Sequence, residues 1–152
     1  MYPFIIVAFM VVLPALSVLA DAMLRGSPLS VILVGKWFVF WMVGIRLFTA
    51  GLRQMTQPQY TARTVLKLTG NDALVVIREL GFANVAMGLL GIVSLAFPDW
   101  RSAAALMGGV FYVLAAGNHV LQSHRSRLQN IAMVTDVFAA VVLLVSFGGL
   151  IR

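Results

Sequence analysis

Residues 31–54 have the sequence VILVGKWFVFWMVGIRLFTAGLRQ, a long and mainly apolar run. It exceeds the roughly 20 residues that an α-helix needs to cross the hydrocarbon core of a bilayer. It nonetheless contains Arg46 and Arg53, and a guanidinium group is costly to place in hydrocarbon. We therefore expect a transmembrane helix whose arginines lie in a polar site or at the membrane boundary.

The composition of the whole chain is that of an integral membrane protein. Of its 152 residues, 61% are hydrophobic and 11% are charged, a balance that is not typical of a soluble domain. The formal net charge of +6 indicates contacts with anionic lipid headgroups rather than nucleic acid, because no basic stripe remains once the apolar runs are assigned. The chain has no cysteine, which excludes disulfides and cysteine-ligated metal centres.

Five apolar runs approach or exceed the length needed to cross a membrane as helices. We predict an all-α bundle, a single domain over residues 1–152, with helices at 3–21, 31–54, 75–97, 102–122 and 130–151. The first run has an alternative interpretation as a secretory signal, because residues 19–22 resemble a cleavage site, but the basic start of such signals is missing. We favour a retained helix with a bend at Pro14. A β-barrel would need short segments of alternating polarity, whereas these runs are continuous.

The distribution of lysine and arginine predicts the orientation in the membrane. With five helices that alternate in direction, one side collects Arg53, Arg63, Lys67, Arg78, Arg125 and Arg127, and the other collects Arg25, Lys36, Arg101 and Arg152. The first, more basic side is expected to be cytoplasmic, which places the N-terminus inside and the C-terminus outside a bacterial plasma membrane. On that side the connection 55–72 contains YTARTVLKL, which suits an interfacial helix or an ordinary loop.

Polar residues inside the predicted helices are candidate functional residues, because hydrocarbon tolerates them poorly. The candidates are Arg46, Glu79, Asn84, Asn118, His119 and Asp136, with Arg53 and Tyr112 as secondary candidates. At about 1.5 Å of rise per residue, Arg46, Asp136, Glu79 and His119 lie roughly 5–12 Å from the basic boundary. We therefore predict a polar pocket among the last four helices, open toward the basic side.

The predicted third helix has two faces of small residues. One face contains Gly81, Asn84, Gly88 and Gly91, and the other begins at Glu79 and continues through Ala83 and Ala86. Small residues allow helices to approach closely in a membrane. We therefore expect this helix to have neighbours on both faces.

Two interpretations of the polar pocket are open. In the first, Arg46 pairs with Glu79, Asp136 or both, and these ion pairs lock four helices in register while Arg53 extends to the interface. In the second, the same residues bind a ligand or relay protons, with His119 hydrogen-bonded to a carboxylate.

Metal and catalytic motifs do not account for these residues. A metal site of Glu79, His119, His124 and Asp136 is disfavoured, because no zinc- or calcium-binding spacing is present and a nearby arginine would repel the ion. The chain also lacks a nucleophile elbow, a phosphate-binding loop and a dinucleotide-binding glycine motif. The aromatic residues of 37–41 predict a belt at the far membrane interface.

Three stretches carry a resemblance to a known family: GIRLFTAGLRQMTQP, RELGFANVAMGLLGIVSL and AAGNHV. Residues 35–122 resemble the DoxX-like superfamily and small bacterial inner-membrane proteins with similar helices. The resemblance implies a four-helix membrane protein, linked in some members to quinone or sulfur redox complexes or to oxidative stress. Glu79 then looks like the acidic residue that opens the glycine-rich helix, and Gly51 like the glycine that ends the helix before it. The additional N-terminal helix and the basic connection 55–72 depart from the family pattern.

We expect a non-enzymatic membrane protein, either an accessory subunit or one that binds a small amphiphile through Arg46, with no cofactor. One alternative is a quinone-linked redox or other membrane enzyme subunit, in which His119 and a carboxylate would move protons. Another is a small transporter that acts as a homo-oligomer, because 152 residues are few for alternating access. The expected partners are membrane lipids and a second copy or another membrane protein, and not nucleic acid.

Overall fold

The computed structural model describes residues 2–121 and 127–151, and every regular element within these ranges is a helix. Five runs are long and apolar enough to span a membrane: Phe4–Arg25, Val31–Thr56, Asp72–Val93, Pro98–Leu121 and Gln129–Leu150. In chain order, these runs are the first to fifth spans. The predicted all-α bundle with five membrane helices is confirmed, and the chain is a multi-pass membrane protein. His124, Arg125 and Arg152 lie outside the described residues.

Several spans combine more than one type of helix. The first contains α1 (Tyr2–Val7), the π-helix η1 (Ala8–Val12) and α2 (Leu13–Arg25), and the second contains α3 (Val31–Phe38), the π-helix η2 (Val39–Ile45) and α4 (Arg46–Thr56). The remaining elements are the π-helix η3 (Tyr60–Val65), α5 (Asp72–Val93), the 3₁₀-helix η4 (Pro98–Trp100), α6 (Arg101–Leu121) and α7 (Arg127–Leu150). The connection 55–72 therefore contains a short helix, η3.

Local sequence explains several of these boundaries. Ser30 caps α3, because its hydroxyl oxygen accepts a hydrogen bond from the Leu33 N–H at 3.2 Å. At the end of α2, Gly26 has a φ of +66°, a left-handed conformation that glycine adopts without strain. Pro14 lies in the first turn of α2, directly after η1. Since proline has no N–H and its ring crowds the preceding turn, the wider π-helical turn accommodates it. The helical irregularity thus lies beside the proline at which a bend was predicted.

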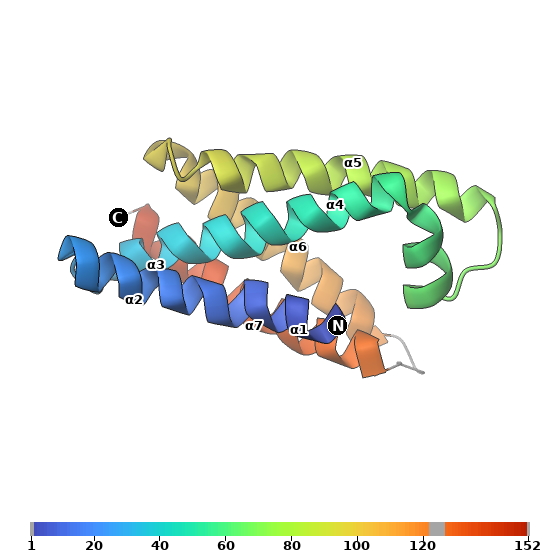
Figure 1. The fold of residues 1–152 in the computed structure, drawn as a ribbon, viewed down its shortest axis with the longest axis horizontal. Coiled ribbons are helices and arrows are strands. Elements are labelled where there is room, and N and C mark those ends of the chain that lie inside the picture. The colour runs from blue at the N-terminus through green and yellow to red at the C-terminus, as the bar shows by residue number, and fades with distance from the viewer. Residues whose placement is uncertain (1, 122–126, 152) are drawn as a thin grey trace.

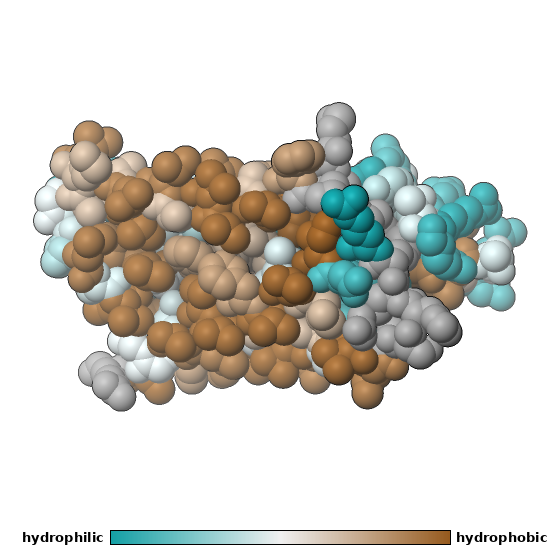
Figure 2. Space-filling view, turned by 90° about the horizontal axis from the view of Figure 1, so that it is seen from below, coloured by the Kyte–Doolittle hydropathy of each residue, from teal (hydrophilic) through white to brown (hydrophobic). Residues whose placement is uncertain are grey.

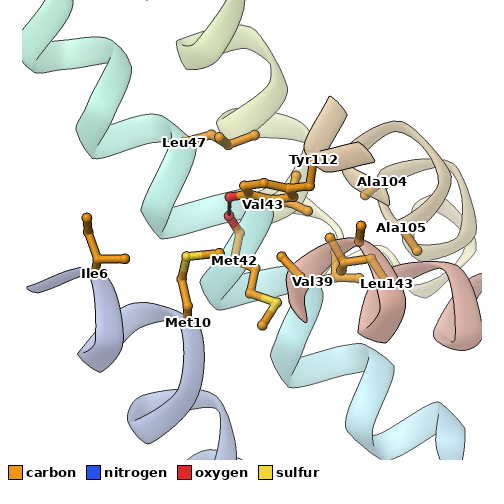
Figure 3. Close-up of a cluster of buried hydrophobic side chains, with 12 residues drawn as sticks. Ile6, Met10, Val39, Met42, Val43, Leu47, Ala104, Ala105, Tyr112 and Leu143 are labelled. Carbon is orange, nitrogen blue, oxygen red and sulfur yellow. Dashed lines mark hydrogen bonds between the residues drawn. The ribbon is translucent and has the colours of Figure 1, made fainter. Parts of the chain in front are cut away.

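The second span is the centre of the bundle. Its η2 and α4 pack on α5, η2 also contacts α6, and α3 contacts α2 and α7. Figure 1 shows α4 and α5 side by side, with α1 and α2 along the opposite edge. The core contains Ile6, Met10, Val39, Met42, Val43, Leu47, Ala104, Ala105, Tyr112, Ala139, Ala140 and Leu143, most of which are labelled in Figure 3. These residues come from the first, second, fourth and fifth spans, whereas the third packs mainly on the second.

Glycines bring the second and third spans into backbone contact. A Cβ atom on Gly51 would lie 2.7 Å from the Gly81 carbonyl oxygen, and one on Gly88 would lie 2.5 Å from the Phe48 nitrogen. Both distances are too short for ordinary van der Waals contact. A larger side chain at either position would therefore push the two helices apart.

The outer surface of the bundle is largely apolar. Val76, Leu114 and Val145, on three different spans, are each more than half exposed. Figure 2 shows this hydrophobic surface over most of one face, with hydrophilic residues gathered at the end that carries η3. Exposed apolar area of this extent marks an interaction surface, and around helices of this length its natural contact is the hydrocarbon of a membrane.

Candidate functional site

A cavity of about 510 Å³ lies among all five spans, in the half of the bundle nearest η3. Its walls contain Ile5, Ile6 and Phe9 of the first span, six residues of the second between Arg46 and Gln54, Leu80 and Asn84 of the third, four residues of the fourth between Phe111 and His119, and Gln129, Ala132 and Asp136 of the fifth. Tyr60, Thr61 and Leu66, in or beside η3, complete the lining. Cavities of roughly 300–1,000 Å³ are typical of small-molecule sites. The cavity lies in the half of the bundle where the sequence analysis expected a polar pocket, but its wall is mainly apolar and includes residues of the first span.

Six of the eight candidate residues line this cavity: Arg46, Arg53, Asn84, Tyr112, His119 and Asp136. The other two, Glu79 and Asn118, are exposed on the outside of the bundle. Their angular position explains this, because successive residues of an α-helix are turned by about 100°. The third span presents Gly81 and Asn84 to the second span, and Glu79 lies about 160° around the helix from Gly81. The small residues that share the Glu79 face are exposed as well, so the expectation of a helix packed on that face is wrong.

The predicted ion pairs of Arg46 are not formed. Among the described residues, no salt bridge joins Arg46 to Glu79 or Asp136, and the Nε atom of Arg46 is buried without a hydrogen-bond partner. Asp136 lines the same cavity as Arg46, but no salt bridge joins these two described residues. A buried polar group that lacks a partner costs about 1–3 kcal/mol, and more when it is charged. Arg46 therefore has hydrogen-bonding capacity that the protein itself does not use.

The π-helix η2 determines where Arg46 lies. Arg46 is the first residue of α4, and its backbone N–H donates to the carbonyl oxygens of Trp41 and Val43. In an uninterrupted α-helix it would donate to the Met42 carbonyl instead. That carbonyl accepts a hydrogen bond of 2.6 Å from the Tyr112 hydroxyl, drawn as a dashed line in Figure 3. Tyr112 of the fourth span thus stabilises the irregular turn that precedes Arg46, and such turns are frequent at functional sites.

A histidine and an aspartate meet between the fourth and fifth spans. The Nε2 atom of His119 lies 3.9 Å from Oδ2 of Asp136, and Asp136 is only 7% exposed. The two side chains are therefore close neighbours, at a distance too long for a direct hydrogen bond. His119 was expected to associate with a carboxylate, and the structure identifies Asp136 as the carboxylate nearest to it among the described residues.

Asn84 contributes a second unused polar atom. Its Nδ2 donates a hydrogen bond to Oε1 of Gln54 at 2.8 Å, whereas its Oδ1 is buried without a partner. Asn84 is 3% exposed, so water outside the bundle does not satisfy this oxygen. The cavity therefore offers a free donor on Arg46 and a free acceptor on Asn84.

Apolar side chains form most of the remaining wall. Ile5, Ile6 and Phe9 face the cavity from the first span, and Leu47 and Phe111 face it from the second and fourth. A few polar groups in a mainly apolar enclosure are the usual composition of a small-molecule site. The arrangement suits a molecule with a polar headgroup and an apolar body.

Comparison with known proteins gives a family for this chain. A family model matches residues 1–148, nearly the whole length. The chain belongs to DUF6790, a family of unknown function. No curated protein and no solved structure matches it. The DUF6790 match includes every residue that lines the cavity, but it does not connect the chain to the DoxX-like superfamily, so that resemblance stays a prediction.

Sequence reasoning missed several polar residues that line the cavity of this DUF6790 chain, including Gln54, Tyr60, Thr61 and Gln129. Gln54 follows Arg46 by eight positions, so helical periodicity places it on the Arg46 face and could have identified it. Tyr60 lies in η3, and its ring centroid is 3.5 Å from the guanidinium carbon of Arg53, a cation–π contact. Arg53 and Tyr60 meet only because the connection between the second and third spans folds back onto the second span.

A separate polar cluster joins the first two spans at the opposite end of the bundle. The Asp21 carboxylate is 4% exposed and accepts hydrogen bonds from Lys36 Nζ at 2.5 Å, Trp37 Nε1 at 2.9 Å and Ser27 Oγ at 2.9 Å. The sequence suggested a cleavage-like segment around Asp21 and an aromatic belt that includes Trp37. In the folded chain both residues belong to a link between helices.

No metal centre is apparent in the part of the chain that the structure describes. Within those residues, no three histidine, aspartate or glutamate side chains gather closely enough to hold an ion. Of the four ligands considered for such a site, Glu79 is turned outward and His124 lies outside the described residues.

Proposed function

We propose that this chain is a bacterial plasma-membrane protein that binds a small amphiphile with an anionic headgroup in the cavity. The observation that carries this proposal is the partnerless Nε of Arg46 in a cavity whose walls are mainly apolar. An acceptor atom on the ligand would receive a charge-assisted hydrogen bond from Arg46 and offset the cost of its burial. The protein then acts as a binding protein or accessory subunit rather than as an enzyme.

The second unused polar atom narrows the class of headgroup. Oδ1 of Asn84 is an acceptor, so a ligand that satisfies both atoms carries a hydrogen-bond donor as well as an anionic group. The apolar part of the ligand would lie against Ile5, Phe9 and Phe111. A lipid fragment or fatty-acid derivative with a hydroxyl or amide near its acidic group meets both conditions.

The proposed orientation places the cavity end of the bundle in the cytoplasm. Five cations support this orientation: they lie at positions 53, 63, 67, 78 and 127, near the ends of the second and third spans, in their connection and at the start of α7. Positive residues are retained on the cytoplasmic side during insertion. Reporter fusions in the connections 57–71 and 26–30 would test this, because only the first should report the cytoplasm.

Native mass spectrometry of protein gently extracted from its own membrane tests the binding proposal. Wild type, Arg46→Ala and Arg78→Ala are compared, since Arg78 is an exposed cation near the same end of the bundle that does not line the cavity. A specific small-molecule adduct should be present in wild type and Arg78→Ala and lost in Arg46→Ala. A bare wild-type chain, or an adduct that Arg46→Ala retains, would contradict the proposal.

The His119–Asp136 pair favours a second candidate, a quinone-linked redox subunit in which these residues move protons. Both side chains line the cavity and lie 3.9 Å apart, so a bound redox molecule could exchange protons with them. In this case the purified protein should contain a quinone, with visible or ultraviolet absorbance that responds to reduction. The variant His119→Gln should keep the bound molecule but slow its reduction, and a colourless, quinone-free preparation would oppose this candidate.

A further inference from the structure

A second cavity, of about 360 Å³, lies at the other end of the bundle and belongs to no part of the proposed amphiphile site. It is lined by Pro98, Asp99, Arg101 and Ser102 at the start of the fourth span, with Ile32 of the second span and Leu150 of the fifth. On the fourth span, Arg101 precedes the nearest residue of the first cavity, Phe111, by ten positions, or about 15 Å of helix. The two cavities therefore open near opposite boundaries of the membrane-spanning region.

Arg101 is the unusual residue of this cavity. It is only 7% exposed, and its Nε atom is buried without a hydrogen-bond partner. Within residues 2–121 and 127–151, no salt bridge joins it to any carboxylate. It also lies in the opening turns of the helical run Pro98–Leu121, where the helix dipole disfavours a positive charge. An anionic group in the cavity would relieve both the unpaired burial and the unfavourable dipole.

Asp99 supplies a charge of the opposite sign to the same cavity. It is exposed, and it lines the cavity without forming a salt bridge to Arg101. Two opposite charges that share a cavity without pairing are complementary to a ligand that carries both a negative and a positive group. Ile32 and Leu150 add apolar surface beside them, at the ends of membrane-spanning helices.

We propose that this cavity binds the headgroup of an aminophospholipid, with the phosphate on Arg101 and the primary ammonium group on Asp99. The phosphate accepts from the guanidinium, and the ammonium donates to the carboxylate. The apolar side chains at the rim contact the glycerol and the upper acyl chains. Because the two groups of the ligand are covalently linked, both protein charges are satisfied by one molecule.

Lipid titration of delipidated protein, followed by native mass spectrometry, tests this site. Phosphatidylethanolamine is compared with phosphatidylglycerol of the same acyl chains, which keeps the phosphate but has no ammonium group. Because the chain carries a formal net charge of +6, general electrostatics alone would favour the anionic phosphatidylglycerol. We expect the reverse, with phosphatidylethanolamine bound about tenfold more tightly, the effect of one additional charge-assisted contact.

Variants assign the preference to the two charges. Arg101→Gln should weaken phosphatidylethanolamine binding by about tenfold or more, and Arg101→Lys by less. Asp99→Asn should abolish the preference over phosphatidylglycerol, and as an exposed position it keeps the test valid if Arg101→Gln does not fold. Arg25→Gln is the matched control, because Arg25 is an exposed cation near the same end outside the cavity, and its binding should equal that of wild type.

Three results would overturn the assignment. They are equal binding of the two lipids by wild type, unchanged binding by Arg101→Gln, and complete displacement of phosphatidylethanolamine by excess inorganic phosphate. The last result would identify free phosphate, rather than a lipid headgroup, as the occupant. Loss of the preference in Asp99→Asn together with resistance to inorganic phosphate would support the aminophospholipid.

Discussion

Replacement of Tyr112 by phenylalanine should destabilise the protein and disturb Arg46 at the same time. Tyr112 is 2% exposed, and its hydroxyl donates to the Met42 carbonyl at 2.6 Å. The Arg46 N–H is engaged with other carbonyl oxygens, so the variant leaves the Met42 carbonyl without this donor. A buried acceptor without a partner costs about 1–3 kcal/mol, whereas the retained ring leaves no large void. We therefore expect the free energy of unfolding to fall by about 1–3 kcal/mol.

The assay is reversible unfolding of the purified protein in mixed micelles, combined with native mass spectrometry of the bound adduct. Val113→Ala is the control, because Val113 is a 47% exposed neighbour on the same helix and should change stability by less than about 0.5 kcal/mol. If η2 holds Arg46 in position, Tyr112→Phe should also retain less adduct than this control. Wild-type stability together with a wild-type amount of adduct would show that Tyr112 does not maintain the π-helical turn.

Three other substitutions test separate parts of the structure. Arg46→Met in delipidated protein should leave the free energy of unfolding unchanged or raise it, because no partner charge is stranded and an unpartnered buried guanidinium is removed. A loss of about 3–5 kcal/mol in the same unfolding assay would instead indicate a buried ion pair. Gly88→Ala should cost about 1–3 kcal/mol, since its Cβ would lie 2.5–2.7 Å from atoms of Phe48, and an unchanged unfolding midpoint would argue against that close contact. Asp21→Ala should lower the thermal midpoint more than Ser27→Ala, because it removes the acceptor of three hydrogen bonds rather than the donor of one, and equal midpoints would contradict this.

The position of each polar residue along its helix could be predicted from the sequence, but the direction in which its side chain points around the helix could not. Rise along a helix is fixed at about 1.5 Å per residue, so the predicted boundaries placed Arg46, His119 and Asp136 in one half of the bundle. Direction around the helix depends on which face packs. The third helix has two faces of small residues, and sequence alone did not decide between them. Contact between Gly81 and the second span turned Asn84 inward and Glu79 outward.

The irregular turns were also beyond sequence reasoning, apart from the one beside Pro14. A π-helical turn at Val39–Ile45 leaves no compositional signature, because it exchanges one backbone hydrogen-bond pattern for another. Its stability depends on Tyr112, which is 70 residues from Met42 in the sequence. The described residues contain no ion pair between Arg46 and Glu79 or Asp136 for a related reason, since side chains at similar depth on different helices need not meet.

Length and hydropathy were enough to predict that this chain crosses a membrane and how many times it does so. Long apolar runs leave helices as the solution that satisfies every backbone group in hydrocarbon, and their number and approximate boundaries follow from length and hydropathy. The third helix, expected at 75–97, begins and ends three to four residues earlier, at Asp72–Val93. Tertiary packing, in contrast, determines which polar groups share a cavity and which of the described ones lack a hydrogen-bond partner. That outcome depends on the rotation and close approach of helices, which are determined by contacts between residues far apart in the chain, such as Gly51 with Gly81.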